Sequence, residues 1–329
     1  SGGSDKSLRT HTRWAQWSGA VTTSGTPPGA RHYHSAVSWI DPSTNEPKMT
    51  VFGGIDGSFK NDVHTLDLKS GAWSGSVSVY GTAPSARYGH SAVGWIDPSS
   101  NKPKMSVFGG TATNVGNQND VYTLDLVTSA WSSTSSGTPP GARKFHSAVS
   151  WIDATNNPKM TVFGGYGTWS YNDVHTLDLV TGAWSGVVGT TWARPSARYG
   201  HSAVGWIDPS GNVPKMTVFG GDDGSYKNDV HTLNLNTNVW SAVATSGGPS
   251  ARYAHSAVGW NDPITNEPKM SVFGGKDGSP YKNDVHTLNL VTGAWSADVT
   301  SGGLSARYVH SAVGWIDPST NEPKMSVFG

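Results

Sequence analysis

Apolar residues along this chain come in short runs, separated by stretches rich in Gly, Pro, Ser, Thr, Asn and Asp. Short apolar runs between turn-forming residues are typical of β-strands, and the 3.6-residue spacing of an amphipathic helix is absent throughout. The first complete unit shows the order: residues 31–41, 48–54 and 61–68, then a short Gly turn and Trp73. Each unit therefore predicts four strands. Apolar residues on both faces, as in 61–68, indicate strands that lie between two neighbouring sheets.

The unit recurs six times. Its histidine in the sequence His-Ser-Ala-Val moves along the chain in steps of 56, 56, 55, 54 and 55 residues, at His34, His90, His146, His201, His255 and His310. A period in this range suits one blade of a β-propeller. Since the repeats are continuous, we expect one domain over residues 1–329.

Four landmarks of the unit resemble the kelch repeat: Arg-x-x-His-Ser-Ala-Val, Val-Phe-Gly-Gly, Asn-Asp-Val-His-Thr-Leu-Asp-Leu and the downstream Trp. The resemblance covers nearly the whole chain. It implies a β-propeller of four-stranded antiparallel blades, the architecture of the central domain of galactose oxidase. The WD40 repeat fits less well, because its Gly-His and Trp-Asp signature is missing and its period is shorter.

The two ends of the chain predict how the ring closes. The sixth copy stops at 327–329, after its second strand, while residues 11–17 resemble a shortened third and fourth strand. We therefore expect an all-β, six-bladed β-propeller in which N-terminal strands pair with the C-terminal strands in one blade, leaving no free sheet edge in the ring. Removing residues 1–17 is expected to expose such edges.

Tryptophan recurs at two places in each unit, and both are expected to pack the blades, because large aromatic rings dominate burial between repeated units. One set follows the first strand, and the other marks the fourth: Trp39, Trp95, Trp151, Trp206, Trp260 and Trp315, and then Trp17, Trp73, Trp131, Trp184, Trp240 and Trp295.

Strand parity divides the connections between two faces. If the His-Ser-Ala-Val strand is innermost, as in the kelch family, the segments that lead into it, such as 82–89, lie on the same face as the loops between second and third strands, such as 109–120. These connections differ in length and chemistry among the six copies, and we call their face the variable face. The turns of the opposite face are almost the same in every copy, and we call it the uniform face.

Two positions after each motif arginine also vary freely, and parity places them at the channel mouth on the variable face. Converging aromatic and polar side chains in a concavity are typical of recognition sites. The arginines offer a planar cationic fork for carboxylates or phosphates, or else tie the blades together through carbonyls or an Asp; in kelch adaptor domains, arginines at this place contact acidic partner motifs. The candidate binding residues are Arg31, Tyr33, Arg87, Tyr88, Arg143, Lys144, Phe145, Arg198, Tyr199, Arg252, Tyr253, Arg307 and Tyr308.

Two tryptophans lie outside the repeated positions, Trp169 and Trp192, and both are expected on the variable face. A ring of this kind stacks on a sugar, a peptide or a base, or packs within its own loop. We include both among the candidate binding residues.

Composition narrows the partner classes. Lys+Arg and Asp+Glu both number 23, so nothing in the charge favours nucleic acid or an anionic membrane. Cysteine is absent, which removes disulfides and thiolate chemistry but leaves the compartment open. With no apolar stretch of membrane-spanning length, we expect a soluble monomer.

The sequence shows no recognised catalytic or metal-binding pattern. The motif histidines and the mid-strand histidines His64, His175, His231 and His286 suit hydrogen-bonded strand positions better than ligation. Loops such as 56–62 lack the acidic spacing of an EF-hand. Galactose oxidase chemistry needs a tyrosine joined to a cysteine, and the iron site of plant specifier proteins needs a Glu-Asp-His pattern that is missing here. We expect no cofactor and no metal.

These observations favour a non-enzymatic binding module that uses the variable face and the channel mouth, for a protein or peptide partner. The alternatives are a carbohydrate-binding, lectin-like propeller and an engineered or structural repeat scaffold without a specific ligand, since the repeats are nearly identical. A hydrolase or metalloenzyme would need a set of catalytic or metal-binding residues that no recognised motif in this sequence indicates.

Overall fold

The computed structural model describes residues 22–133, 135–187, 193–278, 280–298 and 304–329. The expected pairing of the N-terminal strands with the last blade concerns residues 1–17 and lies outside this part of the chain. Every regular element that the structure describes is a β-strand. The fold is therefore all-β, as the sequence predicts.

Each repeat opens with two antiparallel strands. The first strand begins at the serine of the His-Ser-Ala-Val motif, and the second contains the Val-Phe of the double-glycine motif. The first strands are β2 (Ser35–Ile40), β8 (Ser91–Ile96), β15 (Ser147–Ile152), β19 (Ser202–Asp208), β23 (Ser256–Asn261) and β27 (Ser311–Asp317). The second strands are β3 (Pro47–Ile55), β9 (Pro103–Phe108), β16 (Pro158–Phe163), β20 (Val213–Phe219), β24 (Pro268–Phe273) and β28 (Glu322–Phe328).

Third and fourth strands complete five of the sheets within the described residues, with the strands in chain order from the centre outward. The third strands are β4 (Phe59–Asp67), β12 (Val121–Asp125), β17 (Val174–Asp178), β21 (Val230–Asn234) and β25 (Val285–Asn289). The fourth strands are β5 (Ala72–Ser76), β13 (Ala130–Ser132), β18 (Ala183–Val187), β22 (Val239–Val243) and β26 (Trp295–Asp298).

Within the described residues, three sheets have a fifth strand that the four-strand expectation missed. The segment leading into a repeat first runs beside that repeat's own fourth strand, in parallel, before it turns inward. These short outer strands are β1 (Ser24–Thr26), which pairs with β5, β6 (Tyr80–Gly81), which pairs with β13, and β14 (Ser136–Gly137), which pairs with β18. They are only two or three residues long, which is too short for a hydrophobic pattern to indicate them.

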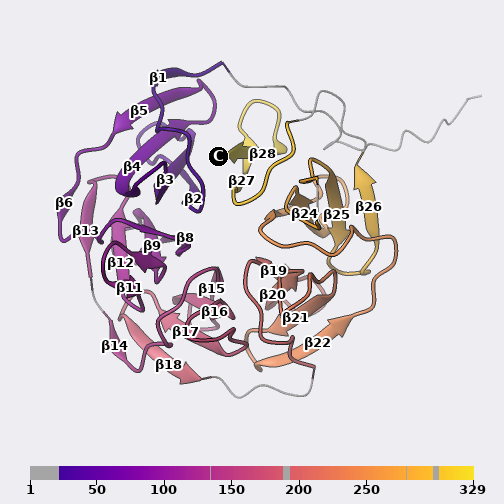
Figure 1. Ribbon diagram of the computed structural model, residues 1–329. Helices are drawn as coiled ribbons and strands as arrows, with labels where there is room; N and C mark the ends of the chain where they lie inside the picture. Colours follow the sequence, from indigo (N-terminus) through magenta and orange to yellow (C-terminus); the bar gives the residue numbers. More distant parts are fainter. Residues whose placement is uncertain (1–21, 134, 188–192, 279, 299–303) are drawn as a thin grey trace, which may run out of the picture.

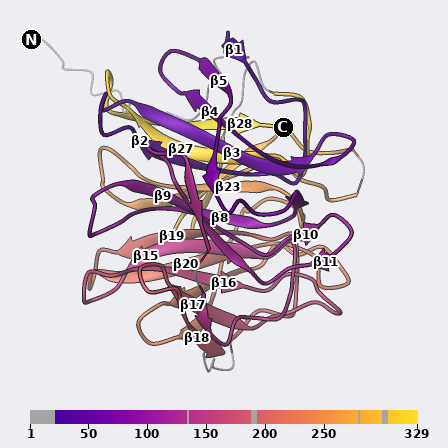
Figure 2. The ribbon, with the colours of Figure 1, turned by 90° about the vertical axis from the view of Figure 1, so that its left-hand side faces the viewer.

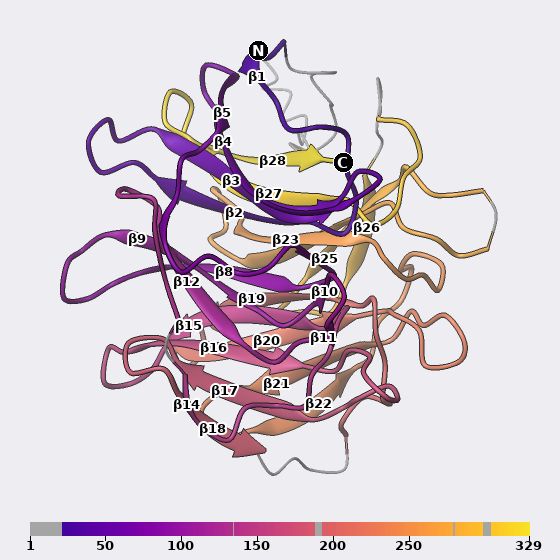
Figure 3. The ribbon, with the colours of Figure 1, turned by 60° about the vertical axis from the view of Figure 1, so that its left-hand side comes forward.

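The sheets stand around a central axis, with the first strands innermost (Figure 1). Turned by 90° or 60°, the strands run along this axis, so that loops and turns gather at its two ends (Figures 2 and 3). A small extra sheet of β7 (Arg87–Tyr88), β10 (Thr111–Ala112) and β11 (Gly116–Asn117) lies at the variable face. The arrangement is β-propeller-like.

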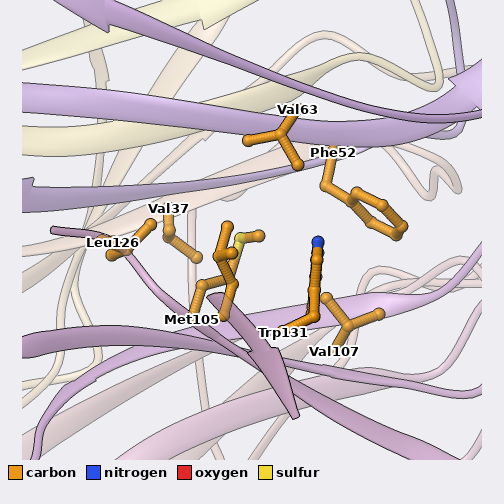
Figure 4. Packing of buried hydrophobic residues seen from close by; sticks show 8 residues of the cluster. Val37, Phe52, Val63, Met105, Val107, Leu126 and Trp131 are labelled. Atoms are coloured by element: carbon orange, nitrogen blue, oxygen red, sulfur yellow. The ribbon is translucent and has the colours of Figure 1, made fainter. Parts of the chain in front are cut away.

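The hydrophobic core lies between neighbouring sheets, because the second strands of the first five repeats are buried on both faces, whereas β28 is half-buried. Met105, Val107 and Phe108 of β9 are all fully buried. In the first of these layers, Phe52 of the first sheet meets Trp131 of the second with ring centroids 5.2 Å apart (Figure 4). Equivalent clusters recur at the following junctions, which confirms that the fourth-strand tryptophans pack the sheets together at the five described positions. Trp17 lies outside the described residues.

The motif histidines join each inner strand to the previous one. His90 Nε2 lies 2.8 Å from Ser35 Oγ of the preceding repeat, and the same contact recurs at the next four junctions. The first and last inner strands also meet, since Ser311 Oγ lies 2.6 Å from His34 Nε2. The six inner strands thus form a continuous series whose last member contacts the first.

In the part of the chain that the structure describes, no helix has the length and apolar character needed to cross a membrane.

Candidate functional site

The motif arginines are anchored inside their own repeats. Arg143 is fully buried, and its guanidinium donates to Asp173 through both Nη1 (2.6 Å) and Nη2 (2.8 Å), and also to the carbonyl oxygens of Gly141 and Gly164, each at 2.9 Å. The same bidentate pairing with an Asp is made by Arg31, Arg87, Arg198 and Arg252, none more than 4% exposed. Arg307 is less buried and donates to Gly329 and Ser305.

The ion pair at Arg143 extends to a third residue. Asp173 Oδ2 lies 2.8 Å from His175 Nε2, so the mid-strand histidine joins the same cluster. Burial alone would raise the pKa of the Asp173 carboxyl, but the hydrogen bonds from Arg143 and His175 outweigh it and hold that pKa well below its usual range. The arginine donors are therefore taken up within the repeat, and the five paired arginines lie beneath the variable face instead of forming a cationic ring on it.

The motif histidines are buried and neutral. Burial, followed by the nearby arginine, lowers the pKa of His90 to about 3, and His34, His201 and His310 are shifted to the same value for the same two leading reasons. Their contacts to serine are those of hydrogen-bonded strand residues, as expected.

The second of the two free positions forms a hydrogen-bonded belt around the axis. In each repeat the N–H at this position donates to the carbonyl of the same position in the preceding repeat, at 2.7–3.0 Å, and Tyr33 N–H donates to Val309 O. All six residues have a left-handed backbone, with φ between 55° and 66°: Tyr33, Gly89, Phe145, Gly200, Ala254 and Val309. We call these six residues the axial belt.

The hydrogen bonds of the axial belt explain why its side chains vary among the repeats while the motif Arg and His do not. The backbone N–H and C=O groups make the contacts between repeats, and these are independent of the side chain. The fixed Arg and His on either side hold the backbone in place. Even Val309, with φ 58°, is kept in a conformation that a β-branched residue rarely adopts.

The axial belt and the motif histidines line a cavity of about 160 Å³ at the mouth of the channel, which we call the axial hollow. Further along the inner strands lies a second cavity of about 320 Å³, lined by small residues of all six repeats such as Ala36, Ser38 and Gly94. The axial hollow is therefore the concave centre of the variable face.

Half-buried aromatic rings cluster on one side of the axial hollow. The Tyr33 centroid lies 4.9 Å from that of Phe145 and 5.7 Å from that of Tyr88, and Phe145 and Tyr199 are 6.4 Å apart. Burial, followed by the nearby tyrosines, raises the pKa of Tyr33 to about 12, so its hydroxyl stays protonated at neutral pH. The structure thus brings together four of the aromatic candidates.

Tyr253 and Tyr308 lie against the loops of the variable face. Tyr253 stacks on Tyr226 with centroids 4.9 Å apart, and Tyr308 lies 4.4 Å from Tyr281. Sequence reasoning missed these loop aromatics, together with Phe59 and Tyr166, which contact Tyr88 and Tyr199. The available signal was an aromatic residue recurring just before the Asn-Asp of the third strand, at Phe59, Tyr171, Tyr226 and Tyr281.

Lys144 places a positive charge among the rings. Its Nζ donates to the Tyr88 hydroxyl at 3.1 Å and lies 5.2 Å and 5.1 Å from the ring centroids of Tyr88 and Phe145. Such contacts orient the ammonium without neutralising it. Lys144 therefore supplies a cation beside the axial hollow.

Trp169 is 64% exposed, and its ring meets that of Tyr171 edge-on at 6.2 Å. It is thus available to a partner at the outer part of the variable face. Trp192 lies outside the described residues.

The loops that resemble a calcium site hold ion pairs. Lys60 lies 2.9 Å from Asp56, and Lys227 lies 3.0 Å from Asp223 at the matching place in the fourth repeat. Among the described residues, no group of three or more His, Asp or Glu side chains is arranged to hold a metal ion.

A β-propeller-like ring of sheets, with repeated Arg–Asp anchors and double glycines, defines the class of protein. The family model described as the KLHDC2/KLHL20/DRC7 Kelch-repeats domain matches residues 3–208 and 188–329. The chain belongs to this kelch-repeat family, as the motifs predict.

Curated relatives match over most of the chain. It is 31% identical to acyl-CoA-binding domain-containing protein 4 of Arabidopsis thaliana over 85% of its length, and 30% identical to human host cell factor 2 over 79%. It is 29% identical to the Drosophila melanogaster homolog of leucine-zipper-like transcriptional regulator 1 over 89%. The matches span only 40%, 32% and 29% of these proteins, respectively.

Proposed function

We propose that this chain is a non-enzymatic binding module that takes a protein or peptide segment across the axial hollow on its variable face. The observation that carries the proposal is the group of half-buried rings of Tyr33, Tyr88, Phe145 and Tyr199 beside Lys144. Aromatic residues are enriched in protein interfaces and dominate their energetic centres. Kelch-family membership supports a binding role.

The same proposal includes the architecture: six blades around one axis, the last completed by the N-terminal segment. The axial belt, in which Tyr33 donates to Val309, and the contact between Ser311 and His34 both support it. Removing residues 1–17 is expected to leave an incomplete blade with exposed edges and a poorly soluble product. A soluble, stable monomer after this truncation would contradict the six-blade assignment.

A role without catalysis fits the use of the titratable groups. The buried Arg143, Asp173 and His175 bond to one another, and the motif histidines are tied to serines of neighbouring strands. In these clusters the polar atoms hold the repeats together, which supports a rigid scaffold that presents a surface.

Carbohydrate binding is the second candidate, and one observation favours it. Trp169 exposes an indole ring at the rim of the variable face, where a sugar face would stack. Trp169 and Tyr88 belong to different repeats, so the two candidate functions are tested by different variants.

The test screens the full chain against displayed random peptides and against a glycan array, then repeats each screen with two variants of one segment. Tyr88→Ala removes a ring at the variable face, while Ile96→Ala removes a side chain that is 50% exposed at the other end of the same strand region. We expect peptide binders whose affinity falls roughly tenfold in Tyr88→Ala and is unchanged in Ile96→Ala. Glycan binding that Trp169→Ala abolishes would overturn the preference for a protein partner.

A further inference from the structure

We propose that the axial hollow takes one uncharged, apolar side chain of the partner segment, either aromatic or branched aliphatic. This inference rests on the proposed function and makes it more specific. It assigns the partner's anchor to the centre of the variable face, with the outer loops contacting the flanking residues.

The volume of the axial hollow fits a single side chain. It measures about 160 Å³, and an apolar protein cavity of about 150 Å³ is large enough to bind benzene. One phenyl ring or one branched aliphatic group would fill it. Two bulky groups would not fit.

The lining of the axial hollow has no formal charge to offer. It consists of the six axial-belt residues and the six motif histidines, so it includes no Asp, Glu, Lys or Arg. Burial keeps these histidines neutral by lowering their pKa values. A charged side chain inside the hollow would lose its water without an oppositely charged group in the lining, because Lys144 lies beside the hollow, among the rings of Tyr88 and Phe145.

The backbone polar groups of the axial belt are also taken. Each N–H of the belt already donates to a neighbouring belt carbonyl, and each motif histidine has its Nε2 beside a serine hydroxyl. A partner that needed hydrogen bonds from these groups would have to compete with these contacts, and the Nδ1 atoms of the same histidines are buried out of its reach. An apolar group would not.

The axial belt is uneven, which gives the axial hollow a shape. Tyr33 and Phe145 form an aromatic wall on one side. Gly89 has no room for more, because an added Cβ would lie 2.7 Å from the Phe145 ring. Ala254 and Val309 are the smaller side chains on the other side, so the space above them is where the partner's anchor would sit.

The axial belt itself suggests how to fill this space. Phe145 and Tyr33 show that an aromatic residue is accommodated at this position with φ near 58°. Ala254→Phe and Val309→Phe therefore place a ring in the axial hollow while keeping a residue type that the belt already contains. Ala254→Gly is the matched control, because it changes the same position without filling the space.

The experiment uses peptides selected from the displayed random library against the full chain, with affinities measured by fluorescence anisotropy. We expect the selected peptides to share one uncharged bulky residue whose replacement by alanine weakens binding roughly tenfold or more. Ala254→Phe and Val309→Phe should weaken binding to a similar extent, and Ala254→Gly should not. Circular dichroism and the thermal midpoint of each variant report whether the fold is retained, and a filling variant that loses its fold is replaced by the other.

Two different failures are distinguishable. Peptides that lose affinity in Tyr88→Ala but bind both filled variants as tightly as the original chain, or that share a charged anchor, would overturn the axial-hollow proposal and leave the proposed function standing. A library that yields no peptide sensitive to Tyr88→Ala would count against the proposed function and, with it, against the anchor.

Discussion

Arg143 and Lys144 are neighbours in the chain, yet the structure uses them in opposite ways. Arg143 is fully buried and bonded on all sides to Asp173 and to carbonyl oxygens. Lys144 lies among the rings of the variable face and donates to Tyr88. The same alternation continues with Phe145, which lines the axial hollow, and His146, which is buried beside Ser91. We call the residues that recur in every copy, such as Arg143 and His146, the frame residues. The free residues between them, such as Lys144 and Phe145, form the surface.

A repeated unit can therefore vary at its surface without losing its fold. The frame residues act through their side chains, so every copy must keep them. The free residues contribute to the frame only through their backbone, in the axial belt. Side chains at the free positions can therefore change while the hydrogen bonds between repeats persist.

Low pH should have the largest effect on the free energy of unfolding, because it favours protonation of all six motif histidines in the unfolded chain. Burial and the nearby arginines lower their pKa values in the folded protein, to about 3 for His34, His90, His201 and His310, so below about 6.5 the unfolded chain binds protons that the folded protein does not. Their contribution is fully present above pH 6.5 and is lost as the pH falls toward the folded value. We expect urea unfolding followed by tryptophan fluorescence to show a steep loss of stability between pH 6.5 and 4.5, approaching about six protons taken up on unfolding.

Variants at His146 and at its free neighbour Phe145 test whether the proton uptake comes from the motif histidines. His146→Gln should reduce the proton uptake by about one, whereas Phe145→Ala, which removes no titratable group, should leave the uptake unchanged. A stability that is flat between pH 6.5 and 4.5 would show that the frame histidines are not held neutral.

The next largest effect is expected from breaking one frame anchor. Arg143→Ala leaves the Asp173 carboxylate without its buried partner, which should cost about 3–5 kcal/mol in the free energy of unfolding. Lys144→Ala should cost about 1 kcal/mol, since the half-buried ammonium makes ring contacts and one hydrogen bond to a neutral hydroxyl in place of a buried ion pair. Equal losses for the two neighbours, measured by urea unfolding at pH 7, would break the distinction between frame and surface.

A smaller loss of stability is expected from substituting the second glycine of the Val-Phe-Gly-Gly motif. In Gly110→Ala the added Cβ would lie 2.7 Å from Tyr88 O and 2.9 Å from His90 Cβ, and such a clash should cost about 1–3 kcal/mol in addition to roughly 1–2 kcal/mol for the left-handed backbone. Gly116→Ala has a similar φ but meets nothing within 4 Å, so only the backbone cost applies. The difference between the urea midpoints of the two variants therefore reports the cost of the steric clash at Gly110.

The smallest stability effect is expected at the rim. Trp169 is 64% exposed, so Trp169→Ala should change the free energy of unfolding by no more than about 0.5 kcal/mol. The matched frame variant, Trp131→Ala, removes a ring that is 3% exposed and should cost about 3–5 kcal/mol. Thermal and urea unfolding of the pair would reveal whether Trp169 has a structural role that its exposure does not indicate.

Much of the fold followed from local pattern, because each repeat carries its own strand and turn signals. The alternation of apolar runs with Gly, Pro and Asn turns predicted the strands, and the repeated tryptophans predicted the packing between sheets, which the cluster of Phe52, Met105 and Trp131 confirms. The short outer strands such as β6 (Tyr80–Gly81) were missed, because two residues that pair through their backbone are too few to leave a pattern in the sequence.

The candidate site followed only in part. Variation among the copies pointed to the free positions, and the structure gathers Tyr33, Tyr88 and Phe145 at one mouth. Repetition alone did not decide whether the arginines face a ligand or an Asp, because either role requires the same residue in every copy. The bidentate pair of Arg143 with Asp173 joins residues 30 positions apart, and only their placement in space decides it.

The repeat, its strands and its family can be predicted from the amino-acid order alone, because they depend on short-range periodicity and on motifs contained within one unit. The tertiary structure decided which polar residues are consumed inside the frame and which remain at the surface. It also decided that six left-handed residues, each from a different repeat, share one belt and enclose one hollow. These features arise where separate repeats meet around an axis, and no single repeat contains the contacts that create them.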